Sequence, residues 1–207
     1  MEPLPTNFFA ESTVSTARHL LGAHLVHEHP AAGRLAGRIV ETEAYTEDDP
    51  ACHASHLSRN PETGTITGQG RGRDLFAAPG TAYVYLIYGV HWLLNVVTEP
   101  EGTAGAVLIR AVEPMAGVDI MQEWRSRPTT DLTNGPGKLT EAFGVDDEQH
   151  GMDLTGPPLY LADGEAVPDE EVATSSRIGI TKGVERPWRW YVTGSSFVSK
   201  GTPSDQK

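Results

Sequence analysis

Residues Arg38 to Tyr45 read RIVETEAY, and this stretch has the pattern of a β-strand that carries two acids and an aromatic ring on one face. Side chains alternate between the two faces of a strand, and the apolar, β-branched pair after Arg38 favours a pleated surface. Glu41, Glu43 and Tyr45 therefore point the same way. Because paired carboxylates repel each other, the stretch indicates either a solvent-facing edge strand or a site whose chemistry needs acids.

The composition is that of a globular protein. The chain has 207 residues, of which 38% are hydrophobic, enough for the core of one domain covering 1–207. We find no run of about 18 apolar residues, and the start, MEPLPTNFF, lacks the basic residues and apolar core of a signal peptide. A single cysteine excludes an internal disulfide framework. The sequence predicts a soluble cytoplasmic protein with loose ends near 1–11, which contains Pro3 and Pro5, and near 201–207.

The charge balance argues against a generally basic nucleic-acid-binding surface. The formal net charge is −12, whereas phosphate binding needs clustered Lys and Arg. The acids concentrate in 47–49, 146–148 and 163–171, and most of the basic residues lie in other stretches. This distribution is compatible with a locally basic face on an acidic body.

Turn residues and hydrophobic periodicity divide the chain into short helices and strands. We expect Ser12 or Thr13 to cap a helix that ends near Gly22, and Pro136 to begin a short helix that ends at Phe143. A further helix is predicted just before Pro128. The predicted strands, besides the one quoted above, cover 24–28, 81–98, 105–112, 158–162, 177–181 and 190–193.

The most strand-like stretch is Thr81 to Thr98, TAYVYLIYGVHWLLNVVT, which predicts a hairpin that turns near Gly89. Such a hairpin carries Tyr88 outward at its tip. The alternative is a buried sheet in which the tyrosines only find hydrogen-bond partners.

Residues 51–80 form a long connection, and connections of this length are usually functional or disordered. Within it, Cys52, His53 and His56 are residue types that bind metals. A tetrahedral structural site needs four ligands, however, and the sequence offers no second cluster of Cys and His. We therefore predict no metal site.

Two basic segments lie near glycines or inside apolar runs. Residues 134–138, NGPGK, are not a nucleotide-binding phosphate loop, because Leu132 and Leu139 replace its first glycine and its hydroxyl residue. The amides at the start of the following helix could still bind a DNA phosphate. Arg110 lies within the apolar run AVLIRAV, where both a salt bridge and phosphate binding remain open.

Taken together, several strings closely resemble the alkyladenine (3-methyladenine) DNA glycosylase family. They occur in the order of that family and cover most of residues 20–200. The strings are RIVETEAY, HAS at 53–55, GTAYVYLIYG, LNVVTEPEG, AVLIRAVEP, NGPGKL and the late RIGI.

The resemblance implies a single α+β domain with a curved, mostly antiparallel sheet, surrounding helices and a protruding hairpin that intercalates into DNA. It also implies a monofunctional glycosylase of base excision repair that acts on alkylated and deaminated purines in double-stranded DNA. Such an enzyme works as a monomer without a cofactor, on the nucleoid if the source is bacterial.

The resemblance also assigns roles residue by residue. Glu43 is the general base, and Tyr45, His53 and Tyr85 line the pocket for the extruded base. Asn95 lies at the pocket floor, where it discriminates against the guanine amino group.

Contacts with DNA are assigned to a second set of residues. Tyr88 is the wedge at the hairpin tip, and Arg110 contacts the nucleotide backbone. Basic side chains expected to contact DNA are Lys138, Arg71 and Arg73. Glu41, the first acid of the strand, is structural on this interpretation.

The sequence departs from the family in one loop. The family commonly has a T-x-R-N segment followed by Met-Phe, whereas residues 69–76 read QGRGRDLF after extra residues at 60–67. The acidic balance is also unusual for a DNA-binding enzyme, and indicates weak non-specific binding or a high-salt cytoplasm.

Two other classes of protein fit the same residues. A nucleoside or small-glycoside hydrolase would use Glu43 and the aromatic rings without DNA. A non-catalytic nucleic-acid-binding module would use the rings for stacking, and its binding would not depend on Glu43.

Overall fold

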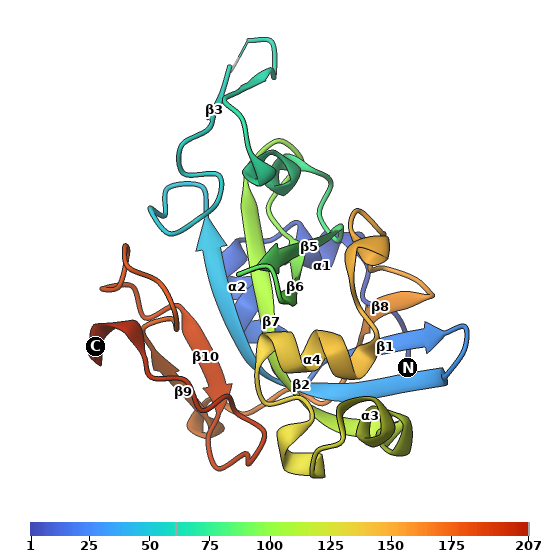
Figure 1. Cartoon of the computed structure of the whole chain (residues 1–207). Helices are drawn as coiled ribbons and strands as arrows, with labels where there is room; N and C mark the ends of the chain where they lie inside the picture. The colour runs from blue at the N-terminus through green and yellow to red at the C-terminus, as the bar shows by residue number, and fades with distance from the viewer. Residues whose placement is uncertain (61, 207) are drawn as a thin grey trace.

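Strand β2 (Gly33–Thr46) runs through the middle of the molecule (Figure 1). The structure is a computed structural model that describes residues 1–60 and 62–206. The other strands are β1 (His24–His29), β3 (Ser58–Arg59), β4 (Ile66–Thr67), β5 (Ala82–Ile87), β6 (His91–Val97), β7 (Gly105–Ala116), β8 (Leu159–Ala162), β9 (Val172–Ser175) and β10 (Arg189–Val192).

The helices are short and lie around the sheet. The α-helices are α1 (Thr6–Phe9), α2 (Thr13–His19), α3 (Val118–Arg125) and α4 (Pro136–Phe143). Short 3-10 helices occur at η1 (Arg71–Phe76), η2 (Thr129–Asp131), η3 (Asp147–Gln149), η4 (Asp169–Glu171) and η5 (Ser204–Gln206). No helix in the described ranges has the length and apolar character needed to span a bilayer.

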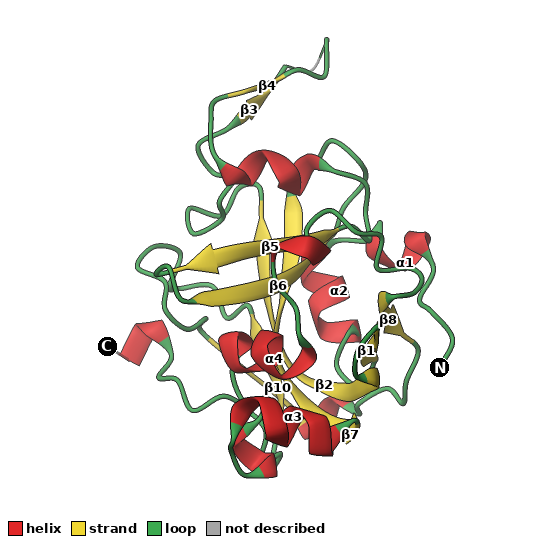
Figure 2. Cartoon of the chain, turned by 45° about the vertical axis from the view of Figure 1, so that its right-hand side comes forward, coloured by secondary structure: helices red, strands yellow, loops and turns green. Residues whose placement is uncertain are grey.

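The main sheet is antiparallel at every pairing in the part of the chain that the structure describes. Its order is β5-β6-β7-β2-β1-β8, and β10 pairs with β2 and β9. The sheet curls around the core, and the helices pack against it (Figure 2). The predicted α+β class with a curved antiparallel sheet is therefore confirmed.

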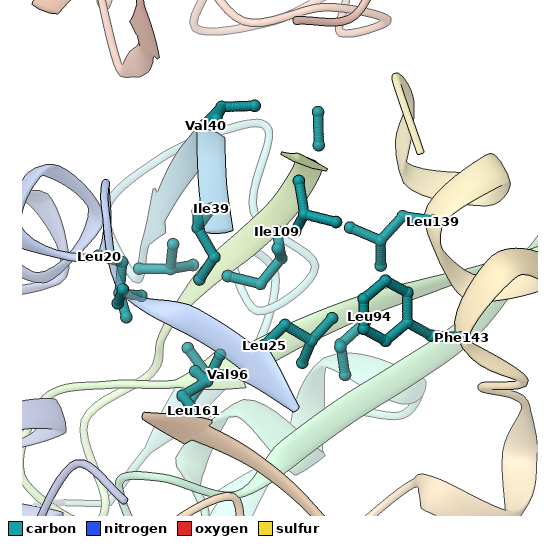
Figure 3. Packing of buried hydrophobic residues seen from close by; sticks show 14 of the residues in the cluster. Leu20, Leu25, Ile39, Val40, Leu94, Val96, Ile109, Leu139, Phe143 and Leu161 are labelled. Carbon is teal, nitrogen blue, oxygen red and sulfur yellow. The ribbon is translucent and has the colours of Figure 1, made fainter. Parts of the chain in front are cut away.

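The core lies inside the curl of the sheet (Figure 3). Leu139 and Phe143 of α4 point toward Ile109 and Leu94 of the sheet, and Leu20 enters from the end of α2. All five side chains are buried. Since burying such a side chain contributes roughly 1.5–3 kcal/mol, this packing fixes α4 against β6 and β7, which carry residues of the site described below.

Local signals place the two helices as expected. Ser12 caps α2 by accepting a hydrogen bond from the Ser15 amide at 3.3 Å. Pro136 occupies the first turn of α4, and Gly144 ends that helix in a left-handed conformation with φ 60°.

The edge-strand interpretation of RIVETEAY is wrong. β2 pairs with β1, β7 and β10, so it lies in the interior of the sheet. Glu41 and Glu43 are fully buried. Their burial follows from pairing with distant parts of the chain, which the local alternation of side chains does not reveal.

Two of the register shifts between β2 and β7 go in opposite directions. Ile39 pairs with Val112 and Glu41 with Ala111, so β2 has one extra residue there. The next pair is Thr42 with Ile109, so the register steps over Arg110 on β7. Bulges of this kind redirect side chains next to functional sites.

Residues near both ends of the chain contact the body of the fold. The Leu4 amide donates to the Leu161 carbonyl at 2.8 Å, and Phe9 is buried in the core. The Ser204 amide donates to the Arg177 carbonyl at 3.0 Å. Lys207, the last residue of the expected loose end, lies outside the described residues.

Candidate active site

A cavity of about 720 Å³ opens beside the β5–β6 hairpin, within the size range of small-ligand sites. Its walls come from β5, β6 and β7, the start of α4, and the loops 50–53 and 178–182. The expected site residues that line it are Tyr45, His53, Tyr85, Asn95, Tyr88, Arg110 and Lys138. The fold thus gathers side chains from distant positions around one space.

Aromatic rings form one wall of the cavity. The ring centroids of His53 and Tyr85 lie 4.7 Å apart, and those of Tyr83 and Tyr85 lie 5.3 Å apart. Nδ1 of His53 lies 2.7 Å from the Tyr83 hydroxyl, which fixes the imidazole ring. Burial, and then the charge of Arg71, lowers the pKa of His53, so the ring is neutral near pH 7. Burial raises the pKa of Tyr85 to about 12.

Close backbone packing positions His53. A Cβ atom on Gly72 would overlap the His53 carbonyl oxygen. Only glycine allows η1 to approach the backbone of His53 this closely. The two ends of the long connection are therefore packed against the site, with Cys52, Leu75 and Phe76 buried around Tyr83.

The carboxylate of Glu43 lies directly behind the cavity wall. It accepts hydrogen bonds from the Tyr45 hydroxyl at 2.8 Å (Oε2) and from the Ile178 amide at 2.7 Å (Oε1). Nη1 of Arg110 lies 3.2 Å from Oε2. Tyr45, Ile178 and Arg110 all line the cavity, so each donor to Glu43 also borders the space for a ligand.

Glu41 occupies the other side of Arg110. Its Oε1 accepts from Nε of Arg110 at 2.9 Å and from Nε of Arg189 at 2.7 Å. The Ser199 amide donates to Oε2 at 2.6 Å, and the Ser199 hydroxyl donates to Oε1 at 2.7 Å. Burial favours a raised pKa for Glu41, but Arg110 and Arg189 outweigh burial and the pKa is lowered. Two acids and two arginines thus form one buried cluster.

A second buried arginine lies against Tyr45. The guanidinium carbon of Arg177 is 4.6 Å from the centroid of the Tyr45 ring, and Arg177 is paired with Asp49. Arg177 also donates to the Ala44 carbonyl at 2.8 Å. Since Ile178 follows Arg177 directly, this anchor holds both the Tyr45 ring and the amide that binds Glu43.

Asn95 lies on β6 at the cavity and is nearly fully buried. Its Nδ2 donates to the Tyr83 carbonyl at 3.0 Å. A carbonyl oxygen only accepts hydrogen bonds, so this contact fixes which end of the amide faces the backbone. The side chain is therefore held in one orientation.

The β5–β6 hairpin turns at Tyr88 and Gly89, as predicted, and extends sideways from the body (Figure 2). Tyr88 is 84% exposed and has φ 53°, a left-handed conformation that is unfavourable for a residue with a side chain. Neighbouring Val90 is 69% exposed. An exposed aromatic ring in a strained conformation is a sign of function rather than of packing.

Helix α4 supports the hairpin and supplies a cation at the cavity. The Thr140 hydroxyl donates to the Trp92 carbonyl of β6 at 2.8 Å. Lys138 lies at the first turn, where its Nζ bonds to Asp131 at 2.6 Å. The hairpin and the start of α4 thus form one continuous rim.

Arg71 and Arg73 both belong to η1, but their contacts differ. Nη1 of Arg71 donates to the Leu86 carbonyl at 3.0 Å, and the guanidinium lies 5.4 Å from the Tyr85 ring centroid. Nη1 of Arg73 donates to the Gly68 carbonyl at 2.8 Å and stabilises the projecting β3–β4 arm (Figure 2). Arg71 is therefore near the cavity, whereas Arg73 lies at the base of the arm.

The charge around the cavity differs from that of the whole chain. Basic side chains that line it are Arg110, Arg125, Lys138 and Lys182. Among the described residues, the one acid in its lining is Glu141, and this carboxylate is paired with Arg125. The cavity lining therefore contains more basic than acidic residues, which agrees with the uneven distribution of charges along the sequence.

The Cys52, His53 and His56 cluster is divided by the fold. Burial raises the pKa of the Cys52 thiol to about 11, and His53 is bound to Tyr83. A ring nitrogen of His56 lies 3.1 Å from the Gln69 carbonyl. Within 1–60 and 62–206, no three His, Cys, Asp or Glu side chains gather as candidate metal ligands.

Sequence reasoning missed the partners that surround the two acids. These partners come from the last part of the chain and reach β2 through β10 and the loops beside it; they are Arg177, Ile178, Arg189 and Ser199. Arg177, the first residue of RIGI, was the one available signal, and it became interpretable only with Asp49 beside it.

An aromatic cavity backed by a buried carboxylate and rimmed by cations is the arrangement of an enzyme that binds a planar ring next to an anionic backbone. The family model for methylpurine-DNA glycosylase matches residues 7–196, and the chain belongs to this family of DNA glycosylases of base excision repair.

Relatives with the name "Putative 3-methyladenine DNA glycosylase" are similar over nearly the whole chain. One from Salinibacter ruber is 72% identical over 205 residues, covering 99% of this chain and 100% of that protein. One from Chlorobium luteolum is 47% identical over 206 residues, covering 99% and 100%. One from Carboxydothermus hydrogenoformans is 42% identical over 199 residues, covering 95% and 98%.

Proposed function

We propose that this protein removes alkylated and deaminated purines from double-stranded DNA and leaves an abasic site. The substrates are 3-methyladenine, 7-methylguanine, hypoxanthine and ethenoadenine, and the attacking group is a water activated by Glu43. The observation that carries the proposal is the contact of Tyr45, a residue of the cavity wall, with the buried carboxylate of Glu43. The enzyme works as a monomeric single domain, without a cofactor, in the cytoplasm and on the nucleoid if the source is bacterial.

The aromatic wall supports recognition of an extruded base. A glycosylase must take the target nucleotide out of the helix, because the sugar carbon is inaccessible inside a duplex. Stacking on an aromatic ring recovers about 1–3 kcal/mol per base, which offsets part of the loss of stacking in DNA. Tyr45 and Tyr85 supply the two faces, and His53 borders the same space.

The hydrogen bonds of Glu43 support a water at one particular oxygen. Each carboxylate oxygen has two acceptor positions. Oε2 already accepts from Tyr45 and lies next to Arg110, whereas Oε1 accepts from the Ile178 amide alone among the described donors. The free position on Oε1 is therefore the place for a water. The carboxylate takes the proton as this water attacks C1′.

The same carboxylate suits the charge of the reaction. Positive charge develops on the sugar as the glycosidic bond breaks, and a buried anion stabilises it. A base such as 3-methyladenine is already cationic and leaves without a dedicated acid. A monofunctional enzyme needs no Schiff base, and of the two lysines that line the cavity, Lys138 is already bound to Asp131.

The rim supports binding of the duplex itself. Tyr88 fills the gap left by the extruded nucleotide, and Arg110, Lys138 and Arg71 are close enough to the cavity to contact the flanking backbone. Arg73 contributes at a greater distance, from the base of the β3–β4 arm.

The direct test is incubation of the protein with a duplex that carries one hypoxanthine. We expect release of free hypoxanthine and strand cleavage only after treatment with alkali, which shows an abasic site without lyase action. No protein–DNA adduct should form with borohydride. Free inosine serves as the control: cleavage of inosine without release of hypoxanthine from the duplex would instead identify a nucleoside hydrolase.

A further inference from the structure

We propose that Glu41 is a positioning residue for this reaction: it holds Arg110 so that only one nitrogen of the guanidinium reaches Glu43. The inference rests on the proposed function, in which Glu43 is the base. Glu41 therefore does more than fill a polar position in the core, and its effect on the rate is exerted through Arg110.

The nitrogens of the Arg110 guanidinium contact different partners. Nε lies 2.9 Å from Glu41, and Nη2 lies 3.4 Å from the Ser199 hydroxyl, which itself bonds to Glu41. Nη1 is the nitrogen that approaches Glu43, at 3.2 Å. Glu41 and Ser199 thus take the Nε–Nη2 edge, which is one of the edges that can bind a carboxylate in a bidentate manner.

The fold is built to present Arg110 in this way. The register of β7 steps over Arg110, so its side chain turns toward the two acids on β2. Glu41 is in turn fixed by Arg189 of β10 and by Ser199 of the segment that follows β10. Three separate parts of the chain therefore combine to hold one carboxylate in one place.

Loss of Glu41 would change the state of the base. A guanidinium released from Glu41 is free to pair with both oxygens of Glu43, which would occupy the acceptor position that a water needs. Glu41 prevents this pairing by competing for the same arginine.

A buried ion cluster is a poor means of stabilisation, which favours a functional role for this one. Desolvation of two charges often costs as much as their attraction returns, and apolar residues of similar volume frequently serve the fold equally well. Glu41 and Arg189 are both buried, and their contact is 2.7 Å. Their retention next to the base is explained if the cluster sets the position of Arg110.

Several charged or titratable groups face Glu43. On β2 these are Glu41 and Tyr45, and on the other elements packed against it they are Arg110, Arg189, Arg177 and Tyr85. The substitutions below change Glu41 and Arg189 and leave the remaining groups in place.

The test compares single-turnover excision of hypoxanthine by wild type, Glu41→Gln and the double variant Glu41→Met/Arg189→Met, each over a range of pH. The double variant removes one charge of each sign, so it retains charge balance if the single variant does not fold. Glu28→Gln is the matched control, because Glu28 forms an exposed ion pair with Arg34 at a distant end of the sheet.

We expect both variants at Glu41 to bind lesion DNA normally but to excise about 10- to 100-fold more slowly, the loss typical when a residue that orients a functional group is removed. The loss should lie in the chemical step alone, and the melting temperature of the folded double variant should stay close to that of wild type. Glu28→Gln should behave like wild type.

Two results would overturn the proposal. One is a wild-type rate in the folded double variant, which would show that Glu41 only balances charge. The other is a slower rate with an equal loss of lesion binding and a lowered melting temperature, which is the signature of a damaged fold. Glu43→Gln is measured in parallel: if that variant keeps the wild-type rate, the assignment of the base has failed, whereas an inactive Glu43→Gln with unaffected Glu41 variants refutes this inference alone.

Discussion

The hydroxyl of Tyr45 donates a 2.8 Å hydrogen bond to Oε2 of Glu43, two residues earlier on the same face of β2. The ring that borders the cavity and the carboxylate behind it are therefore one hydrogen-bonded unit. A base that stacks on Tyr45 is placed next to Glu43 by the backbone geometry of a single strand.

Tyr45→Phe keeps the ring and removes this hydrogen bond. We expect lesion binding to be retained and single-turnover excision to fall by about 10- to 100-fold, since a hydrogen bond to a charged group contributes about 1.5–3 kcal/mol. Equilibrium binding assays measure lesion binding, and single-turnover kinetics measure the chemical step. Lost binding with an unchanged chemical step would show that the hydroxyl serves recognition instead.

Tyr88→Ala should barely alter thermal melting, because the side chain is 84% exposed. It should weaken the flipped complex by up to a few kcal/mol, the scale of lost stacking and restored pairing, and should weaken it less in a mispaired duplex. Base-flipping fluorescence and thermal melting are measured together.

Tyr83→Ala is the matched control on the same strand pair, since Tyr83 is buried. This truncation should cost about 3–5 kcal/mol of stability. A large melting loss for Tyr88→Ala without a flipping defect would remove the hairpin tip from the mechanism.

Asn95→Ala and Asn95→Ser should relax the rejection of guanine-type bases. The amide is held in one orientation by its contact with the Tyr83 carbonyl, and substitution removes the group that a 2-amino substituent meets. The measurement is the ratio of hypoxanthine excision to guanine excision in matched duplexes. The exposed Asn60→Ala provides the control, and an unchanged ratio for the Asn95 variants would show that discrimination lies elsewhere.

His27 makes the folded protein less stable as the pH falls. Its Nδ1 donates to the Phe143 carbonyl at 2.8 Å, and burial lowers the pKa of the ring below 6.5. The unfolded chain therefore binds a proton more readily than the folded one, so stability is present above about pH 6.5 and is lost as the pH falls below it.

His27→Asn keeps a donor for the Phe143 carbonyl but does not titrate. We expect melting of the wild type to fall more steeply than that of the variant between about pH 7 and about pH 5. Parallel pH dependences of the two proteins would show that other groups control acid stability.

Local sequence signals predicted the elements whose limits are set by local chemistry. Helix α4 begins at Pro136 and ends before Gly144, and the hairpin turns at Tyr88 and Gly89, where positive φ favours glycine. The alternation in RIVETEAY also correctly placed the two acids and Tyr45 near one another. Each of these features depends on a few neighbouring residues.

Pairing between distant strands determines features of the site that local sequence signals do not predict. The burial of Glu41 and Glu43 depends on β7 and β10. Arg189 of β10, which is far along the chain, lies opposite Glu43 of β2 in the strand register. The bulge that redirects Arg110 arises from the register between two strands. No spacing within one segment encodes these contacts, so an edge strand remained a reasonable expectation.

The most direct test of the mechanism is single-turnover excision of hypoxanthine from a duplex by wild type and by Glu43→Gln, with lesion binding measured on the same proteins. Glu43→Gln should bind as tightly as wild type and excise about 100-fold more slowly or worse, the range for loss of a general base. Excision by Glu43→Gln at a rate close to that of wild type would contradict the account, because the water would then be activated by another group.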